Sequence, residues 1–361
     1  MSVSDFFSRT YSEAREKFVA AARDAGAALE RFENPAEGPG GESLSTDVAW
    51  LGPRNASRVL VTLSGTHGAE GFCGSGVQVG WFRSGRSQRL PADTALLQIH
   101  AVNPYGFAWL RRTNEDNVDL NRNYVDFDQP LPVNEGYLKY RHLICPDSWS
   151  EEIARETSEE LQRLTDELPP MAMQTAISAG QYVDPEGLFY GGQGPSWSRR
   201  TSETIMDEYL ASAERIAIID YHTGLGPRGY GERIGEGEPG EAEWDRALDW
   251  WGDVTSFADG TSTSAPLQGV SMNGWVRRLS HAEVTPVTLE YGTVPFDRVL
   301  LALRADNWLH AHGEFDSAMG RKIKQQARDA FYQDAGDWKQ MVWSRGIDTQ
   351  EIAMAGLSRT K

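Results

Sequence analysis

The chain has 361 residues, of which 40% are hydrophobic, 24% charged and 10% aromatic, a mixture that excludes a mainly disordered protein. Lys and Arg number 35 against 52 Asp and Glu, so the formal net charge is −17. That charge repels phosphate backbones and anionic lipids alike, which argues against nucleic-acid and membrane partners. The length allows one large α/β domain or two to three smaller ones.

The cysteines and the amino terminus predict a cytoplasmic protein. Cys73 and Cys145 stand far apart without a CxxC motif, so neither a disulfide framework nor a thiolate zinc cluster is indicated. Charges between Asp5 and Lys17 interrupt the stretch where an export signal needs a continuous apolar run. No stretch approaches the roughly 20 apolar residues of a transmembrane helix.

The predicted elements begin with an amino-terminal helix within residues 1–35, because apolar residues between Tyr11 and Phe32 recur at spacings of three and four. A further helix is predicted over residues 148–168. Four apolar runs predict strands, each of which ends in a polar cluster: residues 58–63, 95–102, 215–221 and 284–289. The Gly-, acid- and Trp-rich stretch 227–275 is interpreted as a lid insertion over the site.

Strands that alternate with helical stretches favour a single α/β domain over residues 1–361, with a mostly parallel or mixed sheet. The carboxyl ends of parallel strands meet at one edge of a sheet, which is the usual place for a site. We therefore expect the four polar clusters to converge there. The glycine- and aromatic-rich stretch 187–198 is a candidate pocket wall.

The first and third polar clusters indicate a zinc site. His67 and Glu70 are three residues apart on a turn and can chelate one ion, and His222 supplies a second imidazole. Two imidazoles and one carboxylate leave a coordination position for water. Asp119 is a candidate acceptor for the other ring nitrogen of His67. Because a solvated HxxE pair or a structural strand-end histidine is common, the interpretation depends on the whole set.

The other polar clusters carry candidate catalytic groups. Glu290 ends the fourth strand and can act as a general base, although a salt bridge is the default role for such a residue. Arg111, Arg112 and Arg122 offer a cation for a developing oxyanion and a fork for a substrate carboxylate, with surface ion pairs as the alternative.

Taken in chain order, HxxE, NPYGF…RxNxxxVDLNRN, a strand-end DYHTG and a strand-end LEYG resemble the zinc carboxypeptidase (M14-like) superfamily. The likeness is greatest to its DUF2817 branch, related to succinylglutamate desuccinylase and aspartoacylase. It spans Arg58 to Gly292, and VDLNRN is its most specific element. The resemblance implies a three-layer α/β/α fold with a mixed, mostly parallel sheet. It also implies one Zn²⁺ per chain, held by His67, Glu70 and His222.

The resemblance also implies roles for the other candidates. Asp119 would be the partner of a zinc-ligating histidine, and Asn121 and Arg122 would bind a substrate carboxylate. Arg112 would be the oxyanion residue, with Arg111 as its competitor. Glu290 would be the general acid/base.

The sequence thus predicts a zinc hydrolase that cleaves an amide bond beside a free carboxylate in a small peptide or an N-acyl amino acid. Both substrates stay open, because HGAEG replaces the HxRE-type turn of digestive carboxypeptidases and no tyrosine in residues 227–275 matches their mobile tyrosine. One alternative is a catalytically inactive protein that binds a carboxylate ligand on the same fold. Another is an interaction protein that docks a partner through Trp244, Trp250 and Trp251.

Overall fold

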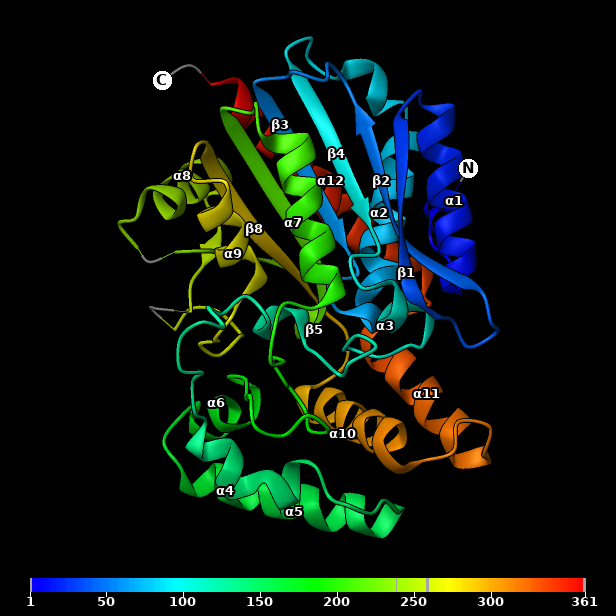
Figure 1. The fold of residues 1–361 in the computed structure, drawn as a ribbon, viewed down its shortest axis with the longest axis vertical. Helices are drawn as coiled ribbons and strands as arrows, with labels where there is room; N and C mark the ends of the chain where they lie inside the picture. Colours follow the sequence, from blue (N-terminus) through cyan, green and yellow to red (C-terminus); the bar gives the residue numbers. More distant parts are fainter. Residues whose placement is uncertain (1, 238, 258–259, 360–361) are drawn as a thin grey trace.

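A computed structural model describes residues 2–237, 239–257 and 260–359. Its centre is an eight-stranded sheet with the strand order β1-β2-β4-β3-β5-β8-β6-β7 (Figure 1). The strands are β1 Ala28–Glu37, β2 Ser43–Leu51, β3 Arg58–Ser64, β4 Thr94–His100, β5 Arg215–Arg228, β6 Gly231–Gly235, β7 Val254–Thr255 and β8 Glu283–Gly292.

The four predicted strands form the middle of this sheet. β4, β3, β5 and β8 are neighbours and run parallel. Their side chains are buried over nearly the whole of β3, β4 and β8 and over residues 216–224 of β5. The sequences of such strands are continuous apolar runs because helices cover both faces of the sheet. β1, β2 and β6 add antiparallel pairs at the two sides. The predicted mixed, mostly parallel sheet is therefore confirmed.

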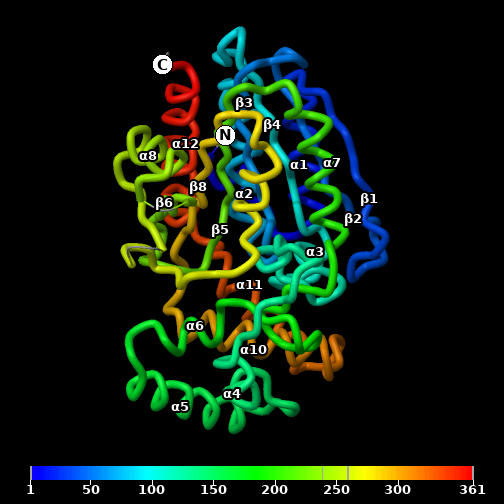
Figure 2. Tube along the Cα trace, turned by 60° about the vertical axis from the view of Figure 1, so that its left-hand side comes forward, coloured from blue at the N-terminus to red at the C-terminus, as the bar shows by residue number. Residues whose placement is uncertain are grey.

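Helices cover both faces of the sheet, which confirms the three-layer α/β/α arrangement (Figures 1 and 2). The α-helices are α1 Tyr11–Asp24, α2 Gly71–Arg83, α3 Pro104–Ala108, α4 Glu135–Ile144, α5 Glu151–Glu167, α6 Ala172–Ser178, α7 Trp197–Leu210, α8 Ala242–Trp251, α9 Ser271–Arg278, α10 Phe296–His312, α11 Ala318–Phe331 and α12 Gly336–Ser358. Side chains of α1, α2, α8 and α12 share one hydrophobic core with the sheet. Those of α7 and α9 form the core on the opposite face.

A group of helices lies beyond the carboxyl ends of the central strands. Both views place α4, α5, α6, α10 and α11 at this end of the molecule (Figures 1 and 2). Their buried side chains form a separate core, with Tyr137, Leu161, Ile177, Leu303 and Phe331 among its members. This helical group therefore faces the edge of the sheet at which the polar clusters end.

The predicted amino-terminal helix is shorter than expected. It ends at Asp24, and Gly26 takes a left-handed conformation with φ of 80° that turns the chain. Residues 28–37 form β1, which pairs antiparallel with β2. The prediction was wrong past Asp24 because Leu29 and Phe32 fit a helical spacing, while pairing with β2 decides their conformation.

The stretch 227–275 contributes β6, α8, β7 and α9, and two of these elements extend the central sheet. Trp244, Trp250 and Trp251 of α8 are buried. They are therefore not exposed for docking a partner, and packing accounts for them. Whether the stretch closes over the site as a lid stays a prediction.

Both cysteines, Cys73 and Cys145, are free and buried. Across the parts of the chain that the structure describes, no helix has the length and hydrophobicity needed to cross a membrane.

Candidate metal centre

A tight turn after β3 carries His67 and Glu70. His67 caps a one-turn 3₁₀ helix, η2 (Gly68–Glu70), which leads directly into α2. Only glycine fits at position 68, because a Cβ atom there would lie 1.9 Å from the carbonyl carbon of Gly106. The backbone N–H of Gly68 donates to the carbonyl of Arg112. The turn is thus held against the loop that carries the predicted oxyanion residue.

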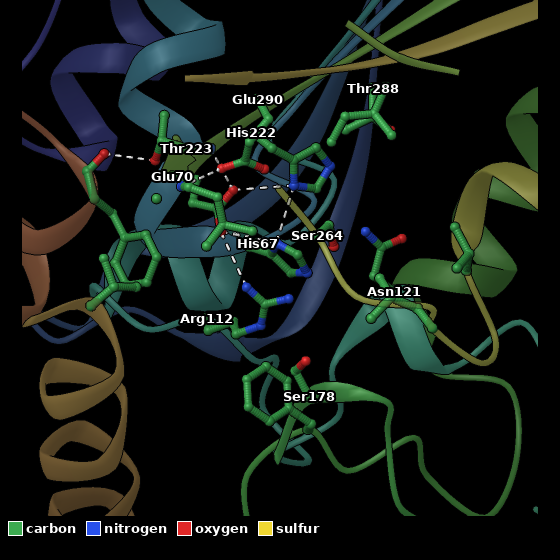
Figure 3. A pocket seen from close by; sticks show the side chains of 18 of the residues that line it. His67, Glu70, Arg112, Asn121, Ser178, His222, Thr223, Ser264, Thr288 and Glu290 are labelled. Carbon is green, nitrogen blue, oxygen red and sulfur yellow. Dashed lines mark hydrogen bonds and ion pairs between the residues drawn. The ribbon is translucent and has the colours of Figure 1, made fainter. Parts of the chain in front are cut away.

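β5 brings His222 beside this turn, because it pairs in parallel with β3. His222 Nδ1 lies 3.1 Å from both His67 Nδ1 and Glu70 Oε2, and Glu70 Oε1 lies 2.9 Å from His67 Nδ1 (Figure 3). All three side chains are buried, and one donor atom from each lies within 4.8 Å of the others. The group has the donor composition of a His₂Glu zinc site.

Hydrogen bonds on the outer side of both imidazoles decide which nitrogen faces the group. His67 Nε2 lies 3.1 Å from Asp119 Oδ1, and His222 Nε2 lies 2.8 Å from Asp220 Oδ2. A carboxylate accepts the N–H proton, so each Nδ1 directs a lone pair inward. Two lone pairs 3.1 Å apart repel unless a proton or a cation lies between them. The donor set therefore fits a divalent ion of the zinc type.

The carboxylates of the group stay ionised. Burial raises the pKa of Glu70, but positive charge on the imidazoles of His67 and His222, as with a proton between them, outweighs burial and holds this pKa below its ordinary value. Burial likewise opposes ionisation of Asp119, yet the charges of Arg112 and Arg122 and the contact with His67 hold its pKa well below the usual range. Negative charge is thus kept beside the two imidazoles, as a cation site requires.

Asp119 joins three of the predicted site residues. Its Oδ1 contacts His67 and accepts the backbone N–H of Asn121 at 2.9 Å. Its Oδ2 accepts a hydrogen bond from Arg112 Nε at 2.8 Å. One buried carboxylate therefore orients an imidazole of the metal group, a guanidinium and the short turn that carries Asn121.

The two adjacent arginines point to different surroundings. Arg112 lines the cavity beside the metal group, where its Nη1 lies 3.4 Å from Glu70 Oε1 and its guanidinium covers the ring of Phe189 (Figure 3). Arg111 is not among the residues that line this cavity. Its Nε lies 4.0 Å from a carboxylate oxygen of Asp306. Arg112 is therefore the arginine with access to a ligand.

Asn121 and Arg122 also line the cavity. Asn121 Oδ1 accepts hydrogen bonds from the backbone N–H and the hydroxyl of Ser271. The amide nitrogen of Asn121 therefore points away from Ser271. Arg122 donates to the carbonyls of Ser178 and Asn121 through three of its five N–H groups. Its other two N–H groups take no part in these bonds, and the three bonds hold the guanidinium in place at the cavity.

Glu290 of β8 is the Cα partner of His222 and lines the same cavity. Its Oε1 accepts the backbone N–H of Leu225 at 2.9 Å. Burial, followed by the negative charge of Glu70, raises the pKa of Glu290 to about 8. A carboxyl group whose pKa is raised by burial is suited to general acid/base chemistry.

Phe189, from the stretch predicted as a pocket wall, lines this cavity.

Tyr291, which follows Glu290 in the chain, does not line the cavity. It is fully buried and donates its hydroxyl hydrogen to the carbonyl of Val342. None of the five histidines other than His67 and His222 lines the cavity.

Two acidic residues at the site were missed from the sequence. Asp220 orients His222, and it stands two positions before that histidine on the same strand, so both side chains share one face. Strand alternation is the signal that identifies it. Glu236 lines the cavity from the acid-rich stretch that was interpreted as a lid, and its sequence neighbours gave no such signal. The roles assigned to all these residues stay predictions.

Comparison with solved structures gives remote similarities. An aspartoacylase family protein from Mesorhizobium loti has 12% identity and a TM-score of 0.40, covering 81% of this chain and 68% of that chain. Carboxypeptidase A from Helicoverpa armigera has 11% identity and a TM-score of 0.44, covering 89% and 74%. A metallo-carboxypeptidase from Burkholderia cenocepacia has 12% identity and a TM-score of 0.43, covering 93% and 69%. At these values the similarities carry no information on activity.

No curated protein matches the sequence. A family model does, and it covers residues 7–345, which is nearly the whole chain. Its description is "Protein of unknown function (DUF2817)". The chain therefore belongs to the DUF2817 family.

Proposed function

We propose that the protein is a zinc-dependent hydrolase that cleaves an amide bond next to a free carboxylate, in a small peptide or an N-acyl amino acid. The observation that carries the proposal is the burial of His67, Glu70 and His222 within one group, with Glu290 on the neighbouring strand facing the same cavity. Two carboxylates that orient the imidazoles from outside support a metal site rather than a chance cluster.

His67, Glu70 and His222 would hold the ion. When bound, zinc supplies Lewis-acid polarisation of the substrate carbonyl and makes water more acidic. Glu290 takes a proton from the attacking water as the water oxygen bonds to the carbonyl carbon. It then gives that proton to the amide nitrogen as the C–N bond breaks. The second proton of the water passes from the new carboxylic acid to the amine, so the products are a carboxylate and an ammonium group. Burial and the charge of Glu70 raise the pKa of Glu290, and the positive charge of a bound ion would lower it, so this carboxyl group is suited both to accept and to donate a proton.

Positive side chains of the cavity account for the rest of the reaction. Arg112 is fixed by Asp119 and directs its remaining N–H groups into the cavity, where it stabilises the negative charge that develops on the carbonyl oxygen. Asn121 and the two free N–H groups of Arg122 bind the substrate carboxylate. In a chain with a net charge of −17, this local positive charge selects an anionic group.

The test combines a substrate screen with one substitution. Zinc-loaded protein is incubated with pooled dipeptides and N-acyl amino acids, and the products are identified by mass, which also decides between the two substrate classes. Glu290→Gln is expected to retain zinc and to lower turnover by at least about 10²-fold. Glu152→Gln, at an exposed position of α5, is the control and should match the wild type.

Two outcomes would contradict the proposal. A Glu290→Gln variant that turns over substrate at the wild-type rate would remove this carboxylate from the mechanism. A zinc-loaded wild type that binds carboxylate ligands and hydrolyses none of the pool would instead favour the inactive, ligand-binding alternative.

A further inference from the structure

Glu236 is a buried carboxylate without a cationic partner. It directly follows β6, and only 3% of its surface is exposed. The one hydrogen bond that it forms with the described residues comes from the hydroxyl of Thr288, at a long 3.4 Å from Oε1. Within the described ranges, no Lys, Arg or His side chain forms an ion pair with it. Burying an ionised carboxylate with so few partners costs folding free energy, so the position of Glu236 needs an explanation.

The neighbouring Glu232 shows what a purely structural carboxylate looks like here. It lies on β6 and is equally buried. Its oxygens accept hydrogen bonds from the hydroxyls of Thr255 and Thr263 and from the backbone N–H of Thr263. Glu232 does not line the cavity, whereas Glu236 does. The protein therefore satisfies one of these two acids internally and leaves the other facing the cavity.

Glu236 lies on the far side of the metal group from the arginines. β6 pairs with β8 so that Ile234 is opposite Thr288, and Thr288 is opposite Asp220 of β5. Ile234 and Thr288 line the same cavity as Glu236 (Figure 3 labels Thr288). Burial, together with the charge of Asp220, raises the pKa of Glu236 to about 7. A cation that reached this carboxylate would relieve the cost of its burial and keep it ionised.

The part of a substrate that reaches Glu236 follows from the other walls. An amino acid with a free carboxylate bears that carboxylate, the nitrogen of the cleaved bond and a side chain on one carbon. Residues 264–271 run along the cavity: Ser264 and Val270 line it, and the hydroxyl of Ser271 donates to Asn121. This segment therefore connects the predicted carboxylate site with the wall that contains Glu236. The opposite wall, from α10 and α11, is apolar and suits an acyl group: Phe296, Val299, Leu303 and Phe331.

We propose that Glu236 determines specificity, by pairing with a positively charged side chain on the amino acid that carries the substrate's free carboxylate. This inference rests on the proposed function and narrows it to peptides or N-acyl derivatives of basic amino acids such as lysine. Within the described residues, Glu236 forms no hydrogen bond or ion pair with the metal group or with Glu290, so its part is recognition and not catalysis.

Binding of two free amino acids tests the recognition without any turnover. L-lysine and L-6-hydroxynorleucine have side chains of equal length, and they differ in an ammonium against a hydroxyl group. Calorimetry on the wild type is expected to show lysine binding at least about tenfold more tightly. In Glu236→Gln the two affinities should agree within about threefold, while hydroxynorleucine binds as in the wild type, which also shows that the variant is folded. Asp245→Asn, at an exposed position of α8, should keep the wild-type ratio.

Hydrolysis of the N-acyl derivatives of the same two amino acids is measured in parallel. Glu236→Gln is expected to raise KM for the lysine derivative about tenfold and to leave kcat within about threefold. Equal affinities for lysine and hydroxynorleucine in the wild type would overturn the inference, as would an equal loss for both ligands in Glu236→Gln. A lysine preference without hydrolysis of any substrate would support the inference on Glu236 and refute the proposed hydrolase instead.

Discussion

Replacing Asp220 by alanine tests whether the outer hydrogen bond of His222 sets the zinc affinity. Asp220 Oδ2 lies 2.8 Å from His222 Nε2, and both of its oxygens accept the hydroxyl hydrogen of Thr66 at 2.9 Å. Without this carboxylate, the buried imidazole loses the partner that keeps its proton on Nε2. The tautomer with the proton on Nδ1 becomes accessible, and that tautomer has no lone pair to direct at the ion.

The expected loss of affinity is about 10- to 100-fold, which is about 1.4 to 2.7 kcal/mol. It also appears as a thermal shift. Zinc at about 100 times the wild-type Kd stabilises the fold by about 2.7 kcal/mol, whereas a 30-fold weaker site gains only about 0.9 kcal/mol. With about 2.1 cal/mol/K of unfolding entropy per residue, the 361 residues give about 0.76 kcal/mol/K. The zinc-induced rise in Tm should therefore fall from about 4 °C to about 1 °C.

The assay is a zinc titration against a chromophoric chelator, with melting curves recorded with and without zinc. Asp220→Asn keeps an acceptor oxygen and should lose less affinity than Asp220→Ala. Asp128→Asn, at an exposed loop position, is the control and should match the wild type. A folded Asp220→Ala protein whose zinc Kd stays within threefold of the wild type would refute the reasoning, since His222 would then not depend on this partner.

Two further predictions concern the support of the site and the response of the fold to acid. Gly68→Ala should destabilise the fold by about 1–3 kcal/mol and weaken zinc binding, because the new Cβ meets the backbone of Gly106 at 1.9 Å. The control is Gly194→Ala, where a Cβ meets nothing within 4 Å, and it should change neither the unfolding free energy in urea nor the zinc affinity in titration. Equal behaviour of the two variants would contradict the steric argument. Burial lowers the pKa of His100 from 6.5 to about 3, so the stability due to its neutral form is complete above pH 6.5 and is lost as the pH falls toward 3. Relative to His100→Phe, the wild type should lose about 1.4 kcal/mol of unfolding free energy per pH unit below about pH 6, and a constant difference from pH 7 to 4.5 would show that His100 is not kept neutral.

The sequence alone predicted the middle of the sheet because buried parallel strands can be recognised from their local sequence. Their apolar runs need no knowledge of partners, and each ends in a polar cluster, as residues 58–63 and 215–221 show. The outer strands could not be recognised in this way. β1 is exposed or half-buried at all but one of its residues and carries residues that also fit a helix, so its pairing with β2 decides its conformation.

The same division holds within the candidate site. The order of the motifs along the chain identified His67, Glu70 and His222, because zinc ligation restricts both residue type and spacing. The resemblance favoured Arg112 but left Arg111 as a competitor, since the two arginines are adjacent and chemically identical. Only the packing of their loop directs one toward Asp306 and the other into the cavity.

By itself, then, the sequence determined which residue types follow which strands, and hence the family, the middle of the sheet and the candidate metal ligands. The tertiary structure decided which carboxylates are left facing the cavity. Glu232 and Glu236 look alike in the sequence, and yet one is satisfied by two threonines while the other faces a ligand space. The physical reason is that hydrogen-bond satisfaction depends on groups brought together from distant segments, whereas strand hydrophobicity is a local property of the chain.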